Sequence, residues 1–250
     1  MGLCHIEPLS RALTGNSWHG RFRTVVTTPD NSHLIDDYLA WQTFPCEYMV
    51  KHIPKTYATK YIANAVPPLA IANWFIRHEL DRYVGHSIDT MVDLFAGIGG
   101  WALALCYYLR IRIKRIIAVD IDARALELYR LNAGKLCGVD VLPVKKDVMS
   151  LGRLPEAELI TMSPPCESVS SANTHATCEP ATSLTVKAIT LAKTTHYDLA
   201  LFEEAPTRKK CRDMLTSILA DNGFKAEYTD LAKYGSLNAR WRLLAYMARQ

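Results

Sequence analysis

The chain has 250 residues, of which 49% are hydrophobic and 22% are charged, a composition typical of a globular protein with a substantial core. Its formal net charge is +4, from 29 Lys and Arg against 25 Asp and Glu, which permits nucleic-acid binding without demonstrating it. No apolar run reaches the roughly 18 residues of a membrane span. Residues 1–11 lack the apolar centre of a signal peptide.

The cysteines give a further expectation about the protein's environment. There are seven of them, an odd number. They form no Cys-x-x-Cys pair, and no cluster of His and Cys has the spacing of zinc ligands. We therefore expect reduced thiols, no metal site and a cytoplasmic protein.

The first third of the chain has weak secondary-structure signals. Residues 1–35 show no regular pattern, and a short helix is predicted at 36–42. A longer helix is predicted from Pro67, because proline is tolerated in a first helical turn whose N–H groups lack partners anyway. Residues 86–90 are predicted to form a linker.

Beyond this linker, apolar strand patterns alternate with helical ones. Repeated strand–helix units of this kind favour an α/β fold with a doubly wound, mostly parallel sheet. Strands are predicted at residues 91–95, 115–119, 141–144, 159–162, 199–203, 225–229 and 242–247. Helices are predicted from the glycine-rich turn after the first strand through residue 110, and at 123–132, 184–194 and 208–220, with a polar loop at 167–180.

Residues at the ends of the first three strands indicate a nucleotide-like ligand. Residues 93–100 read Asp-Leu-Phe-Ala-Gly-Ile-Gly-Gly, and glycines at such a turn let the backbone approach a ligand closely. Asp120 ends the next strand, about 20 residues later, where an acid can hold ribose hydroxyls. Asp147 follows the third strand and is placed to accept from an adenine amino group. Each acid could instead be a helix cap or an exposed loop residue.

The later strand ends carry groups suited to covalent catalysis. Cys166 lies in residues 163–170 (Ser-Pro-Pro-Cys-Glu-Ser-Val-Ser), and its thiolate would be a strong nucleophile, although an inert structural cysteine is the alternative. A buried carboxyl at Glu203 can stay protonated and donate to a ring nitrogen, unless it is an ordinary solvated side chain. Arg240 and Arg242 are two residues apart on an extended segment, so we expect their side chains to point the same way and to hydrogen-bond to a base oxygen or a phosphate.

Together these motifs resemble the cytosine-5 DNA methyltransferase family. The family's opening motif matches residues 93–100, and its Pro-Cys motif matches Pro165 and Cys166. Its Glu-Asn-Val motif appears as Glu-Glu-Ala at 203–205, and its Gln-x-Arg-x-Arg motif appears as Asn-Ala-Arg-Trp-Arg at 238–242. These motifs follow the family's order over residues 91–250. The resemblance implies the Rossmann-like fold of S-adenosylmethionine-dependent methyltransferases.

Two further segments resemble the family's closing motifs but precede its opening one. Residues 63–68 (Ala-Asn-Ala-Val-Pro-Pro) are similar to the closing Gly-Asn-(Ala/Ser)-Val-Pro motif, and residues 39–45 are similar to the end of the ninth motif. The order therefore looks circularly permuted, which is physically easy where chain termini lie close together. We expect residues 1–85 to carry the permuted tail motifs, packed on a catalytic domain at 86–250, with no separate target-recognition domain.

The resemblance also implies roles for residues. S-adenosylmethionine would donate a methyl group to carbon-5 of a cytosine flipped out of double-stranded DNA. Cys166 would attack carbon-6, Glu203 would contact the ring nitrogen, and Arg240 and Arg242 would orient the base and backbone. The implied cofactor-binding residues are Phe95, Ala96, Gly97, Gly99, Gly100, Asp120, Ile121, Asp147, Val148, Pro165, Asn64 and Val66. The family context is cytoplasmic, in bacteria, archaea or phage, where restriction–modification is a typical setting.

Departures from the family pattern leave alternatives open. Glu167 and Glu204 replace residues that are usually amides, and Ala63 replaces a glycine. The chain could methylate a free nucleotide or single-stranded nucleic acid, or a generic protein or small-molecule substrate. It could also be a non-catalytic subunit, or need a second polypeptide for target recognition.

Overall fold

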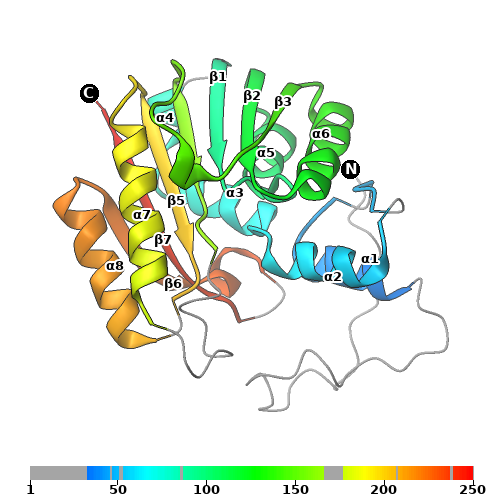
Figure 1. Cartoon of the computed structure of the whole chain (residues 1–250). Helices are drawn as coiled ribbons and strands as arrows, with labels where there is room; N and C mark the ends of the chain where they lie inside the picture. The colour runs from blue at the N-terminus through cyan, green and yellow to red at the C-terminus, as the bar shows by residue number, and fades with distance from the viewer. Residues whose placement is uncertain are drawn as a thin grey trace.

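The computed structural model describes residues 33–45, 47–50, 53–84, 87–165, 177–206, 208–236 and 239–249 (Figure 1). Among these residues, four helices precede the first strand: α1 (His33–Trp41), α2 (Lys55–Asn64), α3 (Pro68–Arg77) and α4 (Asp81–Val84). The helices predicted at 36–42 and from Pro67 are confirmed, and α2 was not predicted. Proline occupies the first turn of α3, as its missing N–H allows.

A seven-stranded sheet forms the centre of the molecule, in the order β3-β2-β1-β4-β5-β7-β6. Its strands are β1 (Ser87–Leu94), β2 (Arg112–Asp120), β3 (Asp140–Lys145), β4 (Leu159–Met162), β5 (Leu199–Glu204), β6 (Lys225–Asp230) and β7 (Trp241–Ala248). The first five strands are parallel, whereas β7 is antiparallel to both β5 and β6. Every residue of β4 and β5 is buried, as expected for central strands covered on both faces. The predicted doubly wound, mostly parallel sheet is confirmed.

Helices follow the strands in the expected alternation. They are α5 (Gly100–Ala102), the π-helix η1 (Leu103–Tyr108), α6 (Ala123–Cys137), the 3-10 turn η2 (Val148–Ser150), α7 (Glu179–Ala192), α8 (Lys209–Asp221) and the 3-10 turn η4 (Leu231–Tyr234). The Asp122 carboxylate caps α6 by accepting from the backbone N–H groups of Arg124 and Ala125. The same helix ends at Gly138, whose φ is 66°.

Three details of the predicted elements are wrong. Residues 86–90 are not a linker, because β1 begins at Ser87 and Ile88 is already 1% exposed. The helix after the first strand becomes a π-helix from Leu103, a widened turn that periodicity alone does not reveal. Helix α7 begins at Glu179 rather than 184, because Pro180 is compatible with a first turn.

Both faces of the sheet are covered, and a third apolar cluster joins the N-terminal helices to the rest. One face packs on α3, η1 and α6, and the other packs on α7 and α8, seen at the left in Figure 1. The third cluster joins Leu39 of α1 and Ile62 of α2 to Leu103 and Leu128, which belong to η1 and α6. Residues before and after position 86 therefore share a buried interface.

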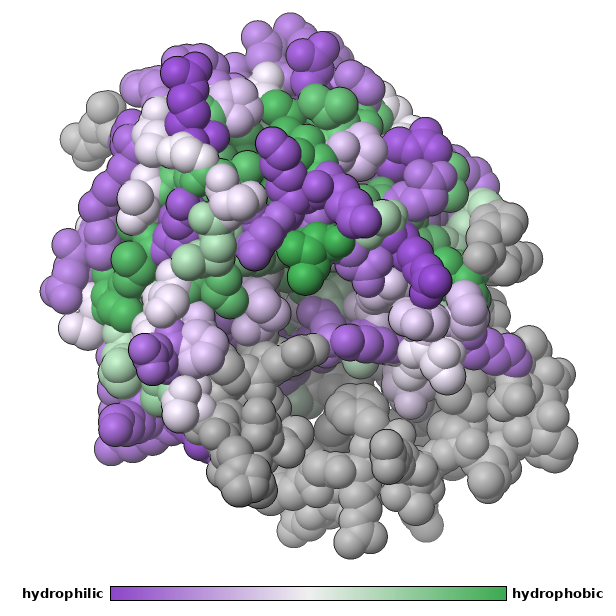
Figure 2. Space-filling model, in the orientation of Figure 1, coloured by the Kyte–Doolittle hydropathy of each residue, from purple (hydrophilic) through white to green (hydrophobic). Residues whose placement is uncertain are grey.

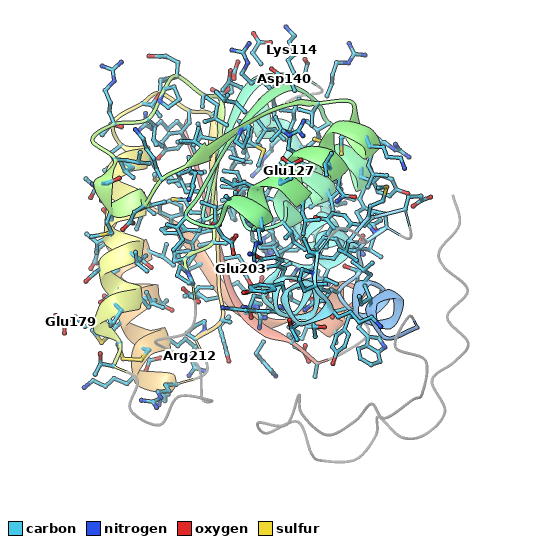
Figure 3. The ribbon with its side chains drawn as sticks, turned by 45° about the vertical axis from the view of Figure 1, so that its right-hand side comes forward. Lys114, Glu127, Asp140, Glu179, Glu203 and Arg212 are labelled. Atoms are coloured by element: carbon cyan, nitrogen blue, oxygen red, sulfur yellow. A yellow bond between two sulfur atoms is a disulfide. The ribbon has the colours of Figure 1, made fainter. Side chains whose placement is uncertain are left out.

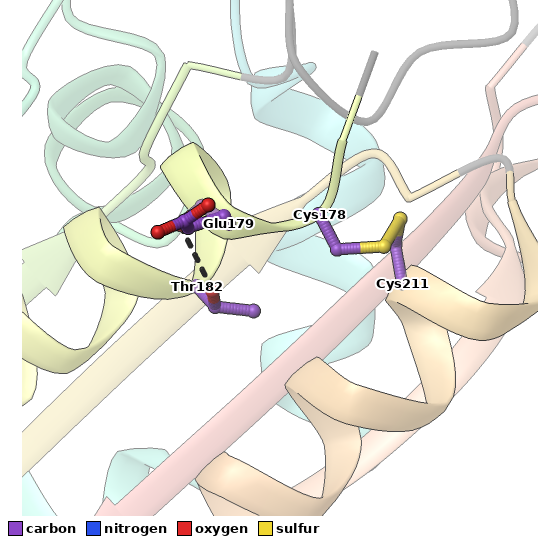
Figure 4. Close-up of a disulfide and its surroundings, with 4 residues drawn as sticks. All are labelled: Cys178, Glu179, Thr182 and Cys211. Carbon is purple, nitrogen blue, oxygen red and sulfur yellow. Dashed lines mark hydrogen bonds between the residues drawn. A yellow bond between two sulfur atoms is a disulfide. The ribbon is translucent and has the colours of Figure 1, made fainter.

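A disulfide joins Cys178, at the start of α7, to Cys211 in α8 (Figure 4). The expectation that all the cysteines are reduced is therefore wrong for this pair. The two residues are 33 positions apart, and they meet because α7 and α8 pack side by side, which the spacing of cysteines in the sequence does not show. None of the helices in the described part of the chain has the length and apolar character needed to span a membrane.

Candidate active site

A cavity of about 390 Å³ opens at the carboxyl ends of the parallel strands. This edge is where ligands bind in open α/β sheets. Figure 2 shows the hollow near the middle of one face of the molecule. The described residues that line it are Tyr61, Ala63, Asn64, Ala65, Val66, Phe95, Ala96, Gly97, Ile98, Gly100, Trp101, Asp120, Ile121, Lys146, Asp147, Val148, Ser163, Pro164, Pro165, Leu184, Glu203, Glu204, Ala205 and Arg242.

The glycine-rich turn after β1 forms the floor of this cavity. Its backbone is left-handed at Phe95 (φ 56°), Gly97 (φ 51°) and Gly99 (φ 87°). The Asp120 carboxylate fixes the turn: Gly97 N donates to Oδ2 at 2.8 Å, and Asp122 N donates to Oδ1 at 2.9 Å. Asp120 therefore joins the ends of β1 and β2 while its side chain faces the cavity.

The segment after α2 forms a second wall and lies directly against this turn. A Cβ atom added to Gly100 would collide with the Val66 carbonyl oxygen, so only glycine allows the two segments to come so close. The Tyr48 hydroxyl donates to the Ile98 carbonyl at 2.6 Å. Tyr61 donates to Asp122 Oδ2, also at 2.6 Å. The N-terminal part of the chain thus completes the cavity.

Ile121 and Asp147 lie on the rim beside Asp120. Ile121 is 67% exposed, which is unusual for a large aliphatic side chain and leaves an apolar surface facing the cavity. Asp147 Oδ1 accepts from Met149 N at 2.8 Å and so caps the 3-10 turn η2. The helix-cap interpretation of Asp147 is thus correct for one oxygen, and the residue also lines the cavity.

At the opposite end of the cavity, Glu203 of β5 pairs with Arg242 of β7. Arg242 Nε lies 2.7 Å from Glu203 Oε1, and the two side chains are only 13% and 9% exposed. The N–H of this nitrogen does not aim at an acceptor among the described residues, so the contact is an ion pair rather than a good hydrogen bond. Attraction between buried opposite charges depends chiefly on their separation. Figure 3 shows Glu203 well inside the molecule, whereas Lys114, Asp140 and Arg212 lie at its periphery.

The segment after β4 leads to the predicted nucleophile. Pro164 and Pro165 line the cavity, and Ser163 Oγ accepts from Trp101 Nε1 at 2.7 Å. Cys166 itself lies outside the described residues, as does Glu167.

Beneath the glycine-rich turn lies a buried acid, Asp93, which is 1% exposed. Tyr129 donates to its Oδ2 at 3.0 Å, and Thr161 donates to its Oδ1 at 2.7 Å. Burial raises the pKa of Asp93 to about 7, although both hydrogen bonds lower it. Asp93 does not line the cavity, so we interpret it as a residue that supports the turn rather than one that binds a ligand.

Most of the residues singled out in the sequence converge on this cavity. Gly99 does not line it. Its Cα faces the Tyr129 ring, and a Cβ atom added there would lie 3.0 Å from Tyr129 Cδ2. Arg240 does not line it either: its guanidinium donates to the carbonyls of Ala63 and Ala65, at 3.0 and 3.1 Å. The expectation that Arg240 points the same way as Arg242 is therefore wrong, because the chain is not yet a regular strand at Arg240, one residue before β7 begins.

Other lining residues were missed. Tyr61 lies on α2, which was not predicted, whereas Trp101 and Leu184 lie within predicted helices and were not singled out. Lys146 directly precedes Asp147, so the strand-end rule that identified Asp147 could have identified it as well. No signal in the sequence identified Leu184.

A family model for C-5 cytosine-specific DNA methylases matches residues 90–244. The chain belongs to the C-5 cytosine-specific DNA methylase family. The methylase is thus an S-adenosylmethionine-dependent methyltransferase, since this family takes its methyl group from that cofactor. No curated protein matches it significantly.

Solved structures similar to the methylase share its fold. Magnesium protoporphyrin IX methyltransferase from Synechocystis PCC 6803, with bound SAH, is 13% identical with a TM-score of 0.52, covering 88% of the methylase and 95% of that chain. PH1948 from Pyrococcus horikoshii, provisionally described as an RNA methyltransferase, is 16% identical with a TM-score of 0.50, covering 85% and 95%. At these identities the likeness establishes a Rossmann-like methyltransferase fold alone.

The lining of the cavity fits S-adenosylmethionine. An exposed aliphatic side chain, Ile121, and two carboxylates at successive strand ends, Asp120 and Asp147, suit an adenine ring and the polar groups around it. The left-handed turn at Gly97, where an added Cβ would meet nothing within 4 Å, leaves backbone rather than side chain at the floor, as close approach of a ligand requires. Among the described residues, no group of three or more His, Cys, Asp or Glu side chains could hold a metal ion.

Proposed function

We propose that this methylase transfers a methyl group to carbon-5 of cytosine in double-stranded DNA through a covalent bond to Cys166. The observation that carries the proposal is the Glu203–Arg242 ion pair, 2.7 Å apart, at the cavity end next to Pro164 and Pro165. A carboxyl and a guanidinium side by side offer one group for a ring nitrogen and amino group and one for a carbonyl oxygen. Cytosine presents these groups on adjacent ring positions.

The chemistry follows from the roles of these residues. The Cys166 thiolate adds to carbon-6 of a flipped-out cytosine, and the ring electrons move to carbon-5. Glu203, in its protonated form, donates a hydrogen bond to the ring nitrogen and so stabilises the electron-rich ring, while Arg242 moves to the base oxygen. S-adenosylmethionine, when bound, supplies an electrophilic methyl group. A base then removes the carbon-5 proton, the carbon–sulfur bond breaks, and the thiolate is regenerated.

We further propose binding roles for the residues of the other cavity end. Asp120 binds the ribose and Asp147 the adenine of the cofactor, with Ile121 and Val148 flanking the ring. Asn64 and Val66 close over the cofactor from the N-terminal segment. Gly99, which faces Tyr129, contributes backbone conformation rather than a ligand contact.

We also propose that residues 1–85 supply the family's closing motifs in circularly permuted order, on a catalytic domain of residues 86–250. The contacts of Val66 with Gly100 and of Arg240 with the carbonyls of Ala63 and Ala65 support this proposal. The cytoplasmic location stays a prediction, and the Cys178–Cys211 disulfide counts against it, because cytosolic thiols are usually kept reduced.

The test is to incubate the purified chain with methyl-labelled S-adenosylmethionine and, in parallel, duplex DNA, single-stranded DNA and free cytidine nucleotides. The proposal expects label in 5-methylcytosine of the duplex and none with Cys166→Ala. Label found only in the single strand, or only in the nucleotide, would mean that this molecule and not duplex DNA is the substrate. No label with any substrate, despite cofactor binding, would indicate a subunit that needs a partner chain.

A further inference from the structure

Two glutamates, Glu203 and Glu204, follow one another at the end of β5, and both line the cavity. Their exposures are 7% and 1%, so neither carboxyl is solvated by bulk water. Glu203 faces Arg242 as described above. Glu204 instead accepts a hydrogen bond on Oε1 from the backbone N–H of Ala205, at 2.8 Å.

The second oxygen of Glu204 is the unusual feature of this site. Within the described part of the chain, Oε2 is fully buried and has no hydrogen-bond partner. A buried polar atom without a partner carries a large desolvation cost, so such atoms are rare and often mark a site where a ligand supplies the partner. Glu204 is also one of the residues that line the cavity, so a small rotation of its side chain would bring this oxygen against a bound molecule.

The charges around Glu204 favour its neutral form. Arg242 is already paired with Glu203, so the two neighbouring carboxyls share one guanidinium. Burial raises the pKa of Glu204 to about 8, and the negative charge of Glu203 raises it further, while the Ala205 N–H and Arg242 lower it. At neutral pH the proton then lies on Oε2, since Oε1 already accepts from Ala205.

We propose that Glu204 is a specificity-determining residue that acts as a neutral carboxylic acid, donating a hydrogen bond from Oε2–H to an acceptor atom of the bound pyrimidine. The inference rests on the proposed function, because it takes the cavity as a base pocket. A neutral carboxyl offers one acceptor and one donor, as the amide at this family position does. An ionised carboxylate would offer only acceptors and would repel both the base oxygen and a polyanionic strand.

This role predicts a specific pH dependence of kcat/KM. Ionisation of Glu204 removes the donor, so kcat/KM for DNA should fall about tenfold per pH unit above the pKa of the group. Ionisation of a catalytic thiol has the opposite sign, because more thiolate forms as pH rises. Glu204→Gln keeps a neutral donor and acceptor at every pH and should abolish the fall. Glu204→Leu removes the donor and should lose about tenfold in kcat/KM at neutral pH.

The experiment combines these kinetics with a direct titration. Carbon-13 NMR of the glutamate carboxyls, with Glu204→Gln to assign the signal, should show Glu204 titrating near pH 8. Glu156→Gln, the same exchange at an exposed position, should leave the pH profile unchanged. Titration near the ordinary value of 4.5, or a pH profile of Glu204→Gln that matches wild type, overturns the inference while leaving DNA methylation intact. A wild-type chain that neither binds nor methylates DNA overturns both.

Discussion

Arg242 and Glu203 lie 2.7 Å apart across the antiparallel pair of β5 and β7, in the least exposed ion pair of the described residues. The pairing register sets Glu203 opposite Leu244, so Arg242 reaches the carboxyl diagonally along the two strands. Because β7 runs antiparallel, its first residues lie at the same sheet edge as the last residues of β5. The final strand therefore places the Arg242 side chain in a site whose other residues come from the ends of parallel strands.

Breaking this pair should destabilise the protein. Arg242→Ala leaves a buried carboxylate without its cation, so the free energy of unfolding should fall by about 3–5 kcal/mol. Adding Glu203→Gln to this variant removes the stranded charge and should recover part of the loss. Urea denaturation measures both changes. Equal stability of Arg242→Ala and wild type would mean that the pair does not form.

Gly100 should not tolerate a side chain. Its built Cβ meets the Val66 carbonyl, and backbone cannot give way as a flexible side chain would. We expect Gly100→Ala to separate the N-terminal segment from the turn, weakening cofactor binding measured by calorimetry and lowering the midpoint of thermal unfolding. Gly152→Ala is the matched control, since a Cβ there meets nothing within 4 Å. Unchanged cofactor affinity in Gly100→Ala would show that the two segments do not make this contact.

Asp93 should make stability depend on pH. Its pKa is raised from 3.8 to about 7, so the folded protein binds this proton more tightly than the unfolded chain does. Its contribution to the free energy of unfolding is therefore greatest below pH 4 and falls as pH rises towards 7, by on the order of a few kcal/mol. Asp93→Asn removes this titration, so the stability of wild type relative to the variant should decrease across that window. A difference that does not vary with pH would exclude a raised pKa.

The disulfide should stabilise the chain through the unfolded state. Closing a loop between positions 33 apart lowers the entropy of the unfolded chain, worth about 3–4 kcal/mol in the chain-entropy model. Reduced wild type and the Cys178→Ser variant should therefore unfold at similar, lower urea concentrations than the oxidised protein. If a reductant leaves the wild-type midpoint unchanged, the two thiols are not joined.

The sequence predicted the sheet because strand ends and helices are local features. Leu159–Met162 was predicted with its observed bounds, since a short, mostly apolar run that ends at prolines favours a buried strand over a helix. Asp120 and Asp147 were identified because parallel strands end at one edge, which brings distant residues together without knowledge of the tertiary structure.

What the sequence could not predict depends on packing between distant segments. The contact between Gly100 and Val66, the turn of Arg240 towards Ala63, and the disulfide all arise from how helices pack. The missing partner of Glu204 Oε2 is likewise a property of the folded interior. Periodicity and motif spacing carry no information on such contacts.

The most direct test of the proposed function is to trap the covalent bond to Cys166. An oligonucleotide duplex with 5-fluorocytosine in place of cytosine, incubated with the protein and S-adenosylmethionine, blocks the last step because fluorine replaces the proton that must leave carbon-5. We predict a protein–DNA adduct that survives denaturation, with the mass of one strand plus one methyl group, attached at Cys166 and absent from Cys166→Ser. Methylation of unmodified DNA without any adduct, or an adduct that persists in Cys166→Ser, would contradict the mechanism.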